Sequence, residues 1–269
     1  MAKKRASQII RRNTLRATLL SVTKAAGKVI RDGLKREVKI QYKGEINLVT
    51  EIDRQSEDLI VKTIRSRFPE HGIIAEEGSL LESRSPYRWI IDPLDGTTNY
   101  AHRFPFFCVS IGLEFEGEMC LGVVYNPVLA ELFFAERGKG ATLNGKPIGV
   151  SPTSSLSQAL LVTGFAYDCR VTKENNMNHF SDFTLQSQGV RRTGSAALDL
   201  SYVACGRFDG FWERRLNPWD VAAGSLLVRE AGGEVSSFSG DRFRVDSKEI
   251  LASNGKIHHA MISVLHPRA

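Results

Sequence analysis

The segment Trp89–Asn99 constrains the fold of this chain more than any other. Its apolar start, Trp89–Ile91, predicts a buried strand, which ends abruptly at Asp92 and Asp95. Carboxylates are the hard oxygen ligands that Mg²⁺ prefers, and the backbone N–H groups of a following turn at Gly96 can bind a phosphate. Asp-Pro and Asp-Gly also form ordinary turns after a strand. The segment therefore predicts either a metal and phosphate site at a strand end or a simple turn.

The hydrophobic pattern predicts two N-terminal helices followed by an antiparallel meander. An apolar stripe at helical spacing predicts a helix over residues 7–34, and the capping-box spacing from Thr50 to Asp53 predicts a second helix that ends near Phe68. Alternating apolar residues separated by turn signals then predict strands. These strands are expected over residues 88–92, 107–115, 119–125 and 131–135.

The pattern changes after a polar linker at Ser151–Ser157, where strands and helices begin to alternate. Strands are expected over residues 159–163, 189–192, 208–213, 234–238 and 250–253, and helices over 196–205 and 219–230. We therefore predict an N-terminal α+β domain over residues 1–150, with an antiparallel sheet and most of the metal ligands. A C-terminal α/β domain over residues 151–269 would complete the site.

The composition is that of a soluble globular protein. The chain is 42% hydrophobic, no apolar run is long enough to span a bilayer, and no secretory signal is present, so we expect a cytoplasmic protein without a membrane partner. Four widely separated cysteines do not match a zinc motif and are expected to be core thiols of a reduced compartment. They are Cys108, Cys120, Cys169 and Cys205.

Positive charge is concentrated at the N-terminus. Residues 1–43 hold thirteen Lys or Arg against Asp32 and Glu37, which gives a local net charge of +11 within a chain of +6. Such a segment is either a solvated helix face or a contact surface for RNA or an acidic protein. Both interpretations stay open at this level.

Three further motifs, Ile74–Ser79, Gly194–Ala197 and Asn217–Gly224, accompany Trp89–Asn99 in the chain. Together they resemble the inositol monophosphatase family of Mg²⁺-dependent, lithium-sensitive phosphatases, over residues 24–254. The segment Thr163–Asp168 resembles the microbial branch of that family. The resemblance implies a layered αβαβα sandwich similar to fructose-1,6-bisphosphatase, commonly assembled as a homodimer.

The same resemblance implies a set of metal ligands. One Mg²⁺ would be held by Glu76, Asp92 and the carbonyl of Leu94, and a second by Asp92, Asp95 and Asp220. A third, weaker ion would use Glu76. Asp220 also lies where an acidic residue caps a helix, which is the alternative interpretation.

Catalytic and phosphate-binding roles follow from the resemblance as well. Thr97 and Glu76 would hold and polarise the water that attacks the phosphate, and Asp53 would accept a hydrogen bond from Thr97. Gly96 and Thr97 would bind the phosphate. Asp53 could equally cap its own helix.

Substrate specificity is the least constrained part of the sequence. The positions that would contact polyol hydroxyls are Asp95, Gly194, Ser195, Ala196 and Glu213, and Lys43 would lie near the phosphate. The resemblance implies hydrolysis of inositol-1-phosphate to inositol and phosphate. The alternatives are fructose-1,6-bisphosphate or another sugar or nucleotide phosphate as substrate, or a non-enzymatic role beside RNA or the transcription machinery.

Overall fold

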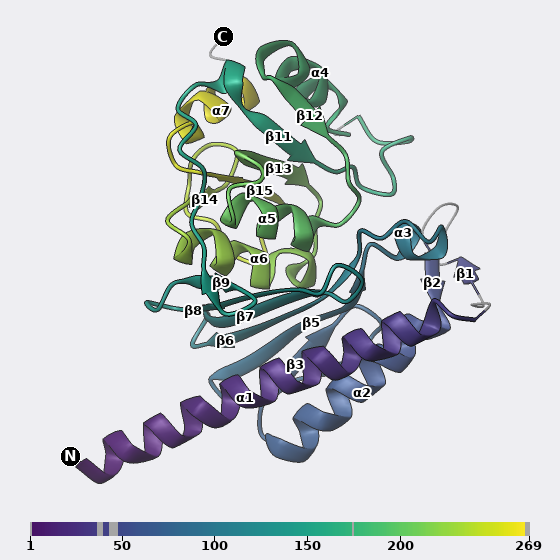
Figure 1. Ribbon diagram of the computed structural model, residues 1–269, viewed down its shortest axis with the longest axis vertical. Coiled ribbons are helices and arrows are strands. Elements are labelled where there is room, and N and C mark those ends of the chain that lie inside the picture. The colour runs from purple at the N-terminus through teal and green to yellow at the C-terminus, as the bar shows by residue number, and fades with distance from the viewer. Residues whose placement is uncertain (1, 37–39, 43–47, 174, 267–269) are drawn as a thin grey trace.

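The computed structural model describes residues 2–36, 40–42, 48–173 and 175–266, which form five stacked layers of helices and sheets (Figure 1). Helices α1 and α2 cover the outer face of an eight-stranded sheet, α5 and α6 lie between this sheet and a five-stranded sheet, and α4 and α7 cover the far side. The helices are α1 (Ala2–Gly33), α2 (Glu51–Arg67), α3 (Thr97–Ala101), α4 (Met177–Gln186), α5 (Ala196–Ala204), α6 (Pro218–Glu230) and α7 (His258–Leu265). The predicted αβαβα sandwich is confirmed.

The eight-stranded sheet has the order β10-β9-β8-β7-β6-β5-β3-β4. From β5 to β8 it is the predicted antiparallel meander, while β3 pairs parallel to β5. Its strands are β3 (Gly72–Ala75), β4 (Leu80–Leu81), β5 (Tyr87–Asp95), β6 (Cys108–Phe115), β7 (Glu118–Asn126), β8 (Glu131–Glu136), β9 (Ala141–Leu143) and β10 (Lys146–Pro147). Because β3 runs parallel to β5, the residues that follow β3 lie beside the end of β5.

The five-stranded sheet has the order β12-β11-β13-β15-β14. Its central strand β13 pairs parallel with β11 and antiparallel with β15. The strands are β11 (Leu160–Thr163), β12 (Gly189–Arg191), β13 (Gly210–Arg214), β14 (Glu234–Ser236) and β15 (Glu249–Ser253). Outside the two sheets lie the hairpin strands β1 (Ile40–Tyr42) and β2 (Leu48–Thr50) and the short 3₁₀ helix η1 (Leu156–Gln158).

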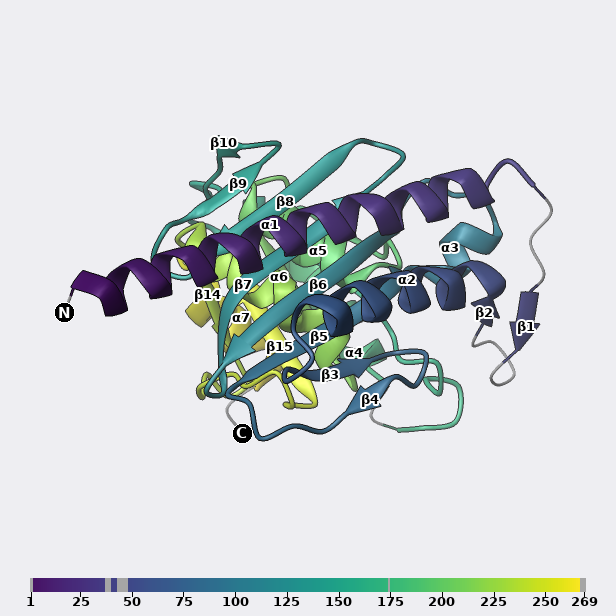
Figure 2. The same ribbon diagram turned by 90° about the horizontal axis from the view of Figure 1, so that it is seen from below.

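Helices α1 and α2 lie side by side across the sheet, as Figure 2 shows. The predicted apolar stripe of α1 is buried, with Leu19 and Ile30 fully covered. Thr50 caps α2 as predicted, because its hydroxyl accepts the N–H of Ile52 and its own N–H donates to Asp53. Both helices thus bury one face against the sheet, and the capping box fixes where α2 begins.

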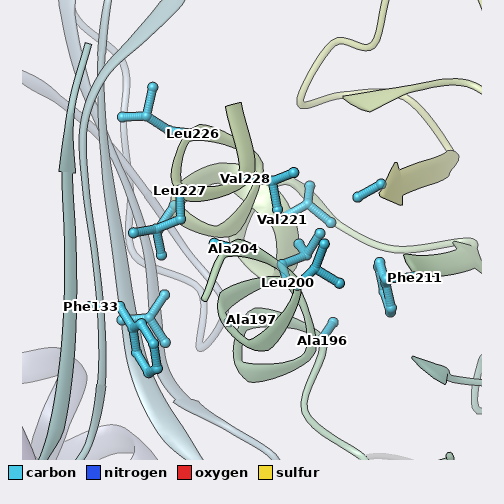
Figure 3. Packing of buried hydrophobic residues seen from close by; sticks show 14 of the residues in the cluster. Phe133, Ala196, Ala197, Leu200, Ala204, Phe211, Val221, Leu226, Leu227 and Val228 are labelled. Atoms are coloured by element: carbon cyan, nitrogen blue, oxygen red, sulfur yellow. The ribbon is translucent and has the colours of Figure 1, made fainter. Parts of the chain in front are cut away.

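Small residues let α6 approach the eight-stranded sheet closely. A Cβ on Gly122 would lie 3.0 Å from the carbonyl oxygen of Ala223, and a Cβ on Gly112 would lie 3.1 Å from the Cβ of Ala222. Between the two sheets, Leu200 and Leu227 join the buried cluster drawn in Figure 3. This close contact holds the start of α6 near the end of β5.

The chain leaves one sheet for the other between Pro147 and Leu160, around the boundary predicted near Ser151. The division into domains 1–150 and 151–269 stays a prediction. Lys43 lies outside the described residues. Within those residues, no helix combines the length and apolar character needed to cross a membrane.

All four cysteines are free, and only Cys108 is fully buried. The interpretation as a core thiol is right for Cys108, and Cys120 and Cys205 are partly exposed but pack against the hydrophobic core clusters. It is wrong for Cys169, which is partly exposed and belongs to none of these clusters.

Candidate active site

The site begins where the parallel strands β3 and β5 end together. Ala75 is in register with Ile91, and the N–H of Glu76 donates to the carbonyl of Ile91 over 3.2 Å. The pairing of β5 with β6 shifts between Asp92 and Asp95, which marks a bulge. Bulges redirect side chains at the end of a strand. Glu76 and the two aspartates therefore reach the same edge of the sheet.

Asp92 is the most deeply buried acid of this group, with 1% of its surface exposed. One carboxylate oxygen, Oδ1, accepts the N–H of Leu94 over 3.0 Å, which bends the chain through Pro93. Burial raises the pKa of Asp92 well above its usual value, and repulsion from Glu76 and the neighbouring aspartates adds to the shift. A buried acid of this kind is stabilised either by a proton or by a cation.

Asp95 connects the first sheet to the second half of the chain. Its Oδ2 accepts the hydroxyl of Ser195 over 2.7 Å and the N–H of Ala197 over 2.8 Å, at the start of α5. Burial raises the pKa of Asp95 to about 6, although these hydrogen bonds favour the charged form. Ser195 and Ala196, both predicted to bind substrate, are therefore held beside a predicted metal ligand.

Asp220 lies in the first turn of α6. Its Oδ2 accepts the N–H of Asn217 over 2.6 Å, and Pro218 occupies the first turn of the helix. The alternative interpretation of Asp220 as a helix cap therefore describes a real contact. Burial, with repulsion from Asp95, raises the pKa of Asp220 to about 8. An aspartate that only capped an exposed helix end would not have such a raised pKa.

Thr97 and Asp53 meet behind the carboxylates. The hydroxyl of Thr97 lies 3.0 Å from Oδ1 of Asp53 and 3.1 Å from the carbonyl oxygen of Leu94. Asp53 also accepts the N–H of Thr50 over 2.8 Å, so it caps α2 and contacts Thr97 at once. Burial raises the pKa of Asp53 to about 6. Both interpretations of this residue therefore correspond to contacts in the structure.

Two glycines make room for the polar groups on the opposite wall. A Cβ on Gly164 would lie 2.5 Å from Cδ of Glu213, so only glycine lets this carboxylate occupy its place. Gly194 has a φ of +91°, and the amide of Asn99 donates to the neighbouring carbonyl of Thr193 over 2.8 Å. Burial raises the pKa of Glu213 well above its usual value.

These groups line one cavity of about 500 Å³. Every predicted site residue within the described part of the chain borders it except Asp53, which lies behind Thr97. The predicted residues on the wall are Glu76, Asp92, Leu94, Asp95, Gly96, Thr97, Gly194, Ser195, Ala196, Glu213 and Asp220. The sequence motifs therefore identify the wall of this cavity, although their individual roles stay predictions.

Arg170 and Arg192, which the sequence reasoning did not assign, also line the cavity. Arg215 lines it too, within the segment Arg214–Leu216 that the sequence reasoning connects with substrate choice. Arg215 also pairs with Asp168 at 2.6 Å. Cationic residues are common on any surface, so the positions of Arg170 and Arg192 carried no signal before the fold placed them here. They supply positive charge opposite the acids.

Among the described residues, no three His, Cys, Asp or Glu side chains already form a group ready to hold a metal ion. Four acids instead line the same cavity: Glu76, Asp92, Asp95 and Asp220. Their mutual repulsion contributes to the raised pKa of Asp92. The set consists of oxygen donors only, which is the chemistry that suits Mg²⁺. The residues fit such an ion, provided that the carboxylates draw together around it.

A layered α/β fold with an acidic cavity between its sheets defines the class of protein, and comparisons with known proteins define the family. The model of the inositol monophosphatase family matches residues 12–268, so the chain belongs to this family. An inositol-1-monophosphatase of Synechocystis is 54% identical over 229 residues, covering 84% of this chain and 80% of the relative.

Two further relatives match almost the whole chain. The solved structure of an inositol monophosphatase from Anabaena is 47% identical, with a TM-score of 0.87, and the match covers 95% of this chain and 96% of that one. A protein named Nus factor SuhB from Pseudomonas aeruginosa is 43% identical over 255 residues, covering 92% of this chain and 94% of the relative. The chain is therefore a phosphatase of the inositol monophosphatase family.

Proposed function

We propose that the protein hydrolyses inositol-1-phosphate to inositol and phosphate with Mg²⁺ and water. The observation that carries this proposal is the arrangement of four acids from three separate segments around one cavity: Glu76, Asp92, Asp95 and Asp220. Bound Mg²⁺ would activate water and neutralise the charge of the phosphate. Similarity to the Synechocystis inositol-1-monophosphatase supports this choice of substrate.

The chain's own residues divide the task of holding two or three ions. Glu76, Asp92 and the carbonyl of Leu94 would hold one, and Asp92, Asp95 and Asp220 a second, with Glu76 also available to a third. The raised pKa values of Asp92 and Asp220 support these roles, because a cation would replace the proton that each buried acid otherwise retains.

Thr97 would position the water. Its hydroxyl has one hydrogen and two acceptors within reach, Asp53 and the carbonyl of Leu94. When the Leu94 carbonyl is engaged, that hydrogen points to Asp53, and the oxygen of Thr97 can accept from water. Glu76 would polarise the same water, and Gly96 and Thr97 would offer N–H groups to the phosphate.

The opposite wall would bind the polyol. Glu213 is a buried acceptor beside Gly164, and Gly194, Ser195 and Ala196 lie at the start of α5, where the hydroxyl of Ser195 donates to Asp95. Hydroxyls of an inositol ring are suited to such acceptors. Fructose-1,6-bisphosphate or another sugar or nucleotide phosphate remains the alternative, since the arginines at the cavity can receive additional negative charge.

A panel of phosphate esters tests the proposal. Phosphate release should be fastest with inositol-1-phosphate, compared with fructose-1,6-bisphosphate and NADP⁺ at matched concentrations, and EDTA should abolish it. Preference for either alternative would reassign the substrate while keeping the chemistry. Release that persists in EDTA would reject the metal mechanism. Millimolar Li⁺ should inhibit, with K⁺ as the control for ionic strength.

A second role beside RNA or the transcription machinery is favoured by one observation, the similarity to a protein named Nus factor SuhB. The +11 charge of residues 1–43 would form the contact surface. Part of that charge is engaged within the chain, because Arg12 pairs with Glu136 and the guanidinium of Arg16 lies 5.0 Å from the ring centroid of Phe134. We also propose that the protein is cytoplasmic and assembles as a homodimer.

A further inference from the structure

The first two turns of α2 bury a polar face, whereas the buried faces of helices are usually apolar. Asp53, Ser56 and Glu57 are exposed by no more than 3%, and all three point to loops of the active site. We propose that Ser56 and Glu57 are positioning residues that set the distance between the metal ligands Glu76 and Asp92. The inference rests on the proposed function, because it assumes that these acids bind Mg²⁺.

Glu57 holds the loop that carries Glu76. One carboxylate oxygen, Oε2, accepts the N–H of Glu77 over 2.8 Å, and the other, Oε1, accepts the N–H of Ser79 over 3.0 Å. Two hydrogen bonds to a single buried carboxylate fix both the position and the rotation of the loop. Gly78, between the two donors, has a φ of +109°, the left-handed conformation that such a tight turn requires.

Ser56 holds the loop that carries Asp92 and Asp95. Its hydroxyl donates to the carbonyl of Pro93 over 2.9 Å, next to the predicted ligand carbonyl of Leu94. Asp53, one turn before Glu57 on the same helix, contacts Thr97. Because these residues are three and four positions apart, a single rigid helix face contacts every segment that the eight-stranded sheet contributes to the site.

A helix holds its side chains at fixed spacings more rigidly than a loop does. Metal sites need their ligands held to within about 0.5 Å, and residues that orient ligands through hydrogen bonds typically contribute 10–100-fold to metal affinity. The strands β3 and β5 fix where their loops start, whereas α2 fixes where those loops turn. Loss of the Glu57 contacts should therefore weaken Mg²⁺ binding while the fold persists.

Glu57→Gln is the direct test. The glutamine keeps the volume and one acceptor, but its amide group presents N–H donors to a backbone N–H. Calorimetric titration with Mg²⁺ should show affinity lowered by about 10–100-fold. Hydrogen exchange at the amides of Glu77 and Ser79 should accelerate, and the Mg²⁺ concentration for half-maximal turnover should rise in step with the dissociation constant.

Asp209→Asn is the matched control. Asp209 is also a buried carboxylate, 7% exposed, that accepts a backbone N–H, from Leu160 over 2.6 Å, and a hydroxyl, from Ser151. It lies just before β13, four residues ahead of Glu213 and about 13 Å along the strand from it. This variant should lose stability without any change in Mg²⁺ affinity.

The outcomes separate the inference from the proposed function. If the parent protein binds no Mg²⁺, the proposed function fails. If the parent binds Mg²⁺ but Glu57→Gln binds it equally well, or loses no more affinity than Asp209→Asn, the positioning role is wrong. Should Glu57→Gln fail to fold, Ser56→Ala takes its place, with a smaller loss of Mg²⁺ affinity expected and unchanged affinity contradicting the inference.

Discussion

Gly164→Ala tests whether Glu213 binds the polyol. The new Cβ would lie 2.5 Å from Cδ of Glu213, whereas ordinary contacts begin at 3.4 Å, so the carboxylate has to move by about 1 Å. The backbone at Gly164 is outside the left-handed region, so alanine adds no strain there. Glu213 should therefore lose its alignment while the chain keeps its fold.

The magnitude follows from the hydrogen bond that is lost. A hydrogen bond to a charged group contributes about 1.5–3 kcal/mol, which corresponds to roughly a 10–150-fold fall in kcat/KM for inositol-1-phosphate. The same variant should cleave p-nitrophenyl phosphate at nearly the parent rate, because that ester has no hydroxyls for Glu213 to accept. Steady-state kinetics with both esters measures this difference.

Gly149→Ala is the control, since its Cβ would lie 3.7 Å from the carbonyl oxygen of Ala231 in an ordinary contact. It should leave both substrates unaffected. Equal losses of kcat/KM for the two esters in Gly164→Ala, or no loss for inositol-1-phosphate, would refute the assignment of Glu213 as a polyol-binding residue.

Three further predictions follow from the buried acids and the basic segment. Asp95→Asn should abolish turnover, and Mg²⁺ should raise its Tm by less than that of the parent, because one anionic ligand is gone; equal shifts of Tm would count against this ligand. Burial raises the pKa of Asp95 to about 6 and of Asp220 to about 8, so the metal-free folded protein retains protons that the unfolded chain has released. Its free energy of unfolding should therefore fall as pH rises from about 4 to about 8, and saturating Mg²⁺ should reduce that fall; urea denaturation in EDTA that shows rising stability would contradict this sign. Replacing Arg11, Arg12 and Arg16 with Gln should flatten the salt dependence of RNA binding, by about 0.7 in the log-log slope per lost contact, without changing phosphatase turnover; unaltered RNA binding would leave the segment as a solvated helix face.

The sequence predicted those parts of the fold whose side chains repeat with a clear period. The apolar stripe of α1 and the capping box of α2 are local patterns, and both are confirmed. Helices α4 and α7 were missed. Both helices are short, with ten residues in α4 and eight in α7, and α7 begins with two histidines that obscure its pattern.

The candidate site was predictable wherever motifs carried its residues, and not where the fold alone assembled it. Strand β3 is only four residues long, so its parallel pairing beside β5 had no periodic signal. Glu57 was missed for the same reason, since its two partners lie more than 19 positions away in the chain. Contacts of this kind exist only after the loops have folded onto α2.

The central claim is that Mg²⁺-dependent attack by water, without a covalent intermediate, releases phosphate. Rapid acid quenching of the enzyme with ³²P-labelled inositol-1-phosphate, across a titration of Mg²⁺, tests this claim most directly. We expect labelled phosphate to form only when Mg²⁺ is present, with no label retained on the protein at any time. Label trapped on a side chain, or phosphate released in EDTA, would contradict the account.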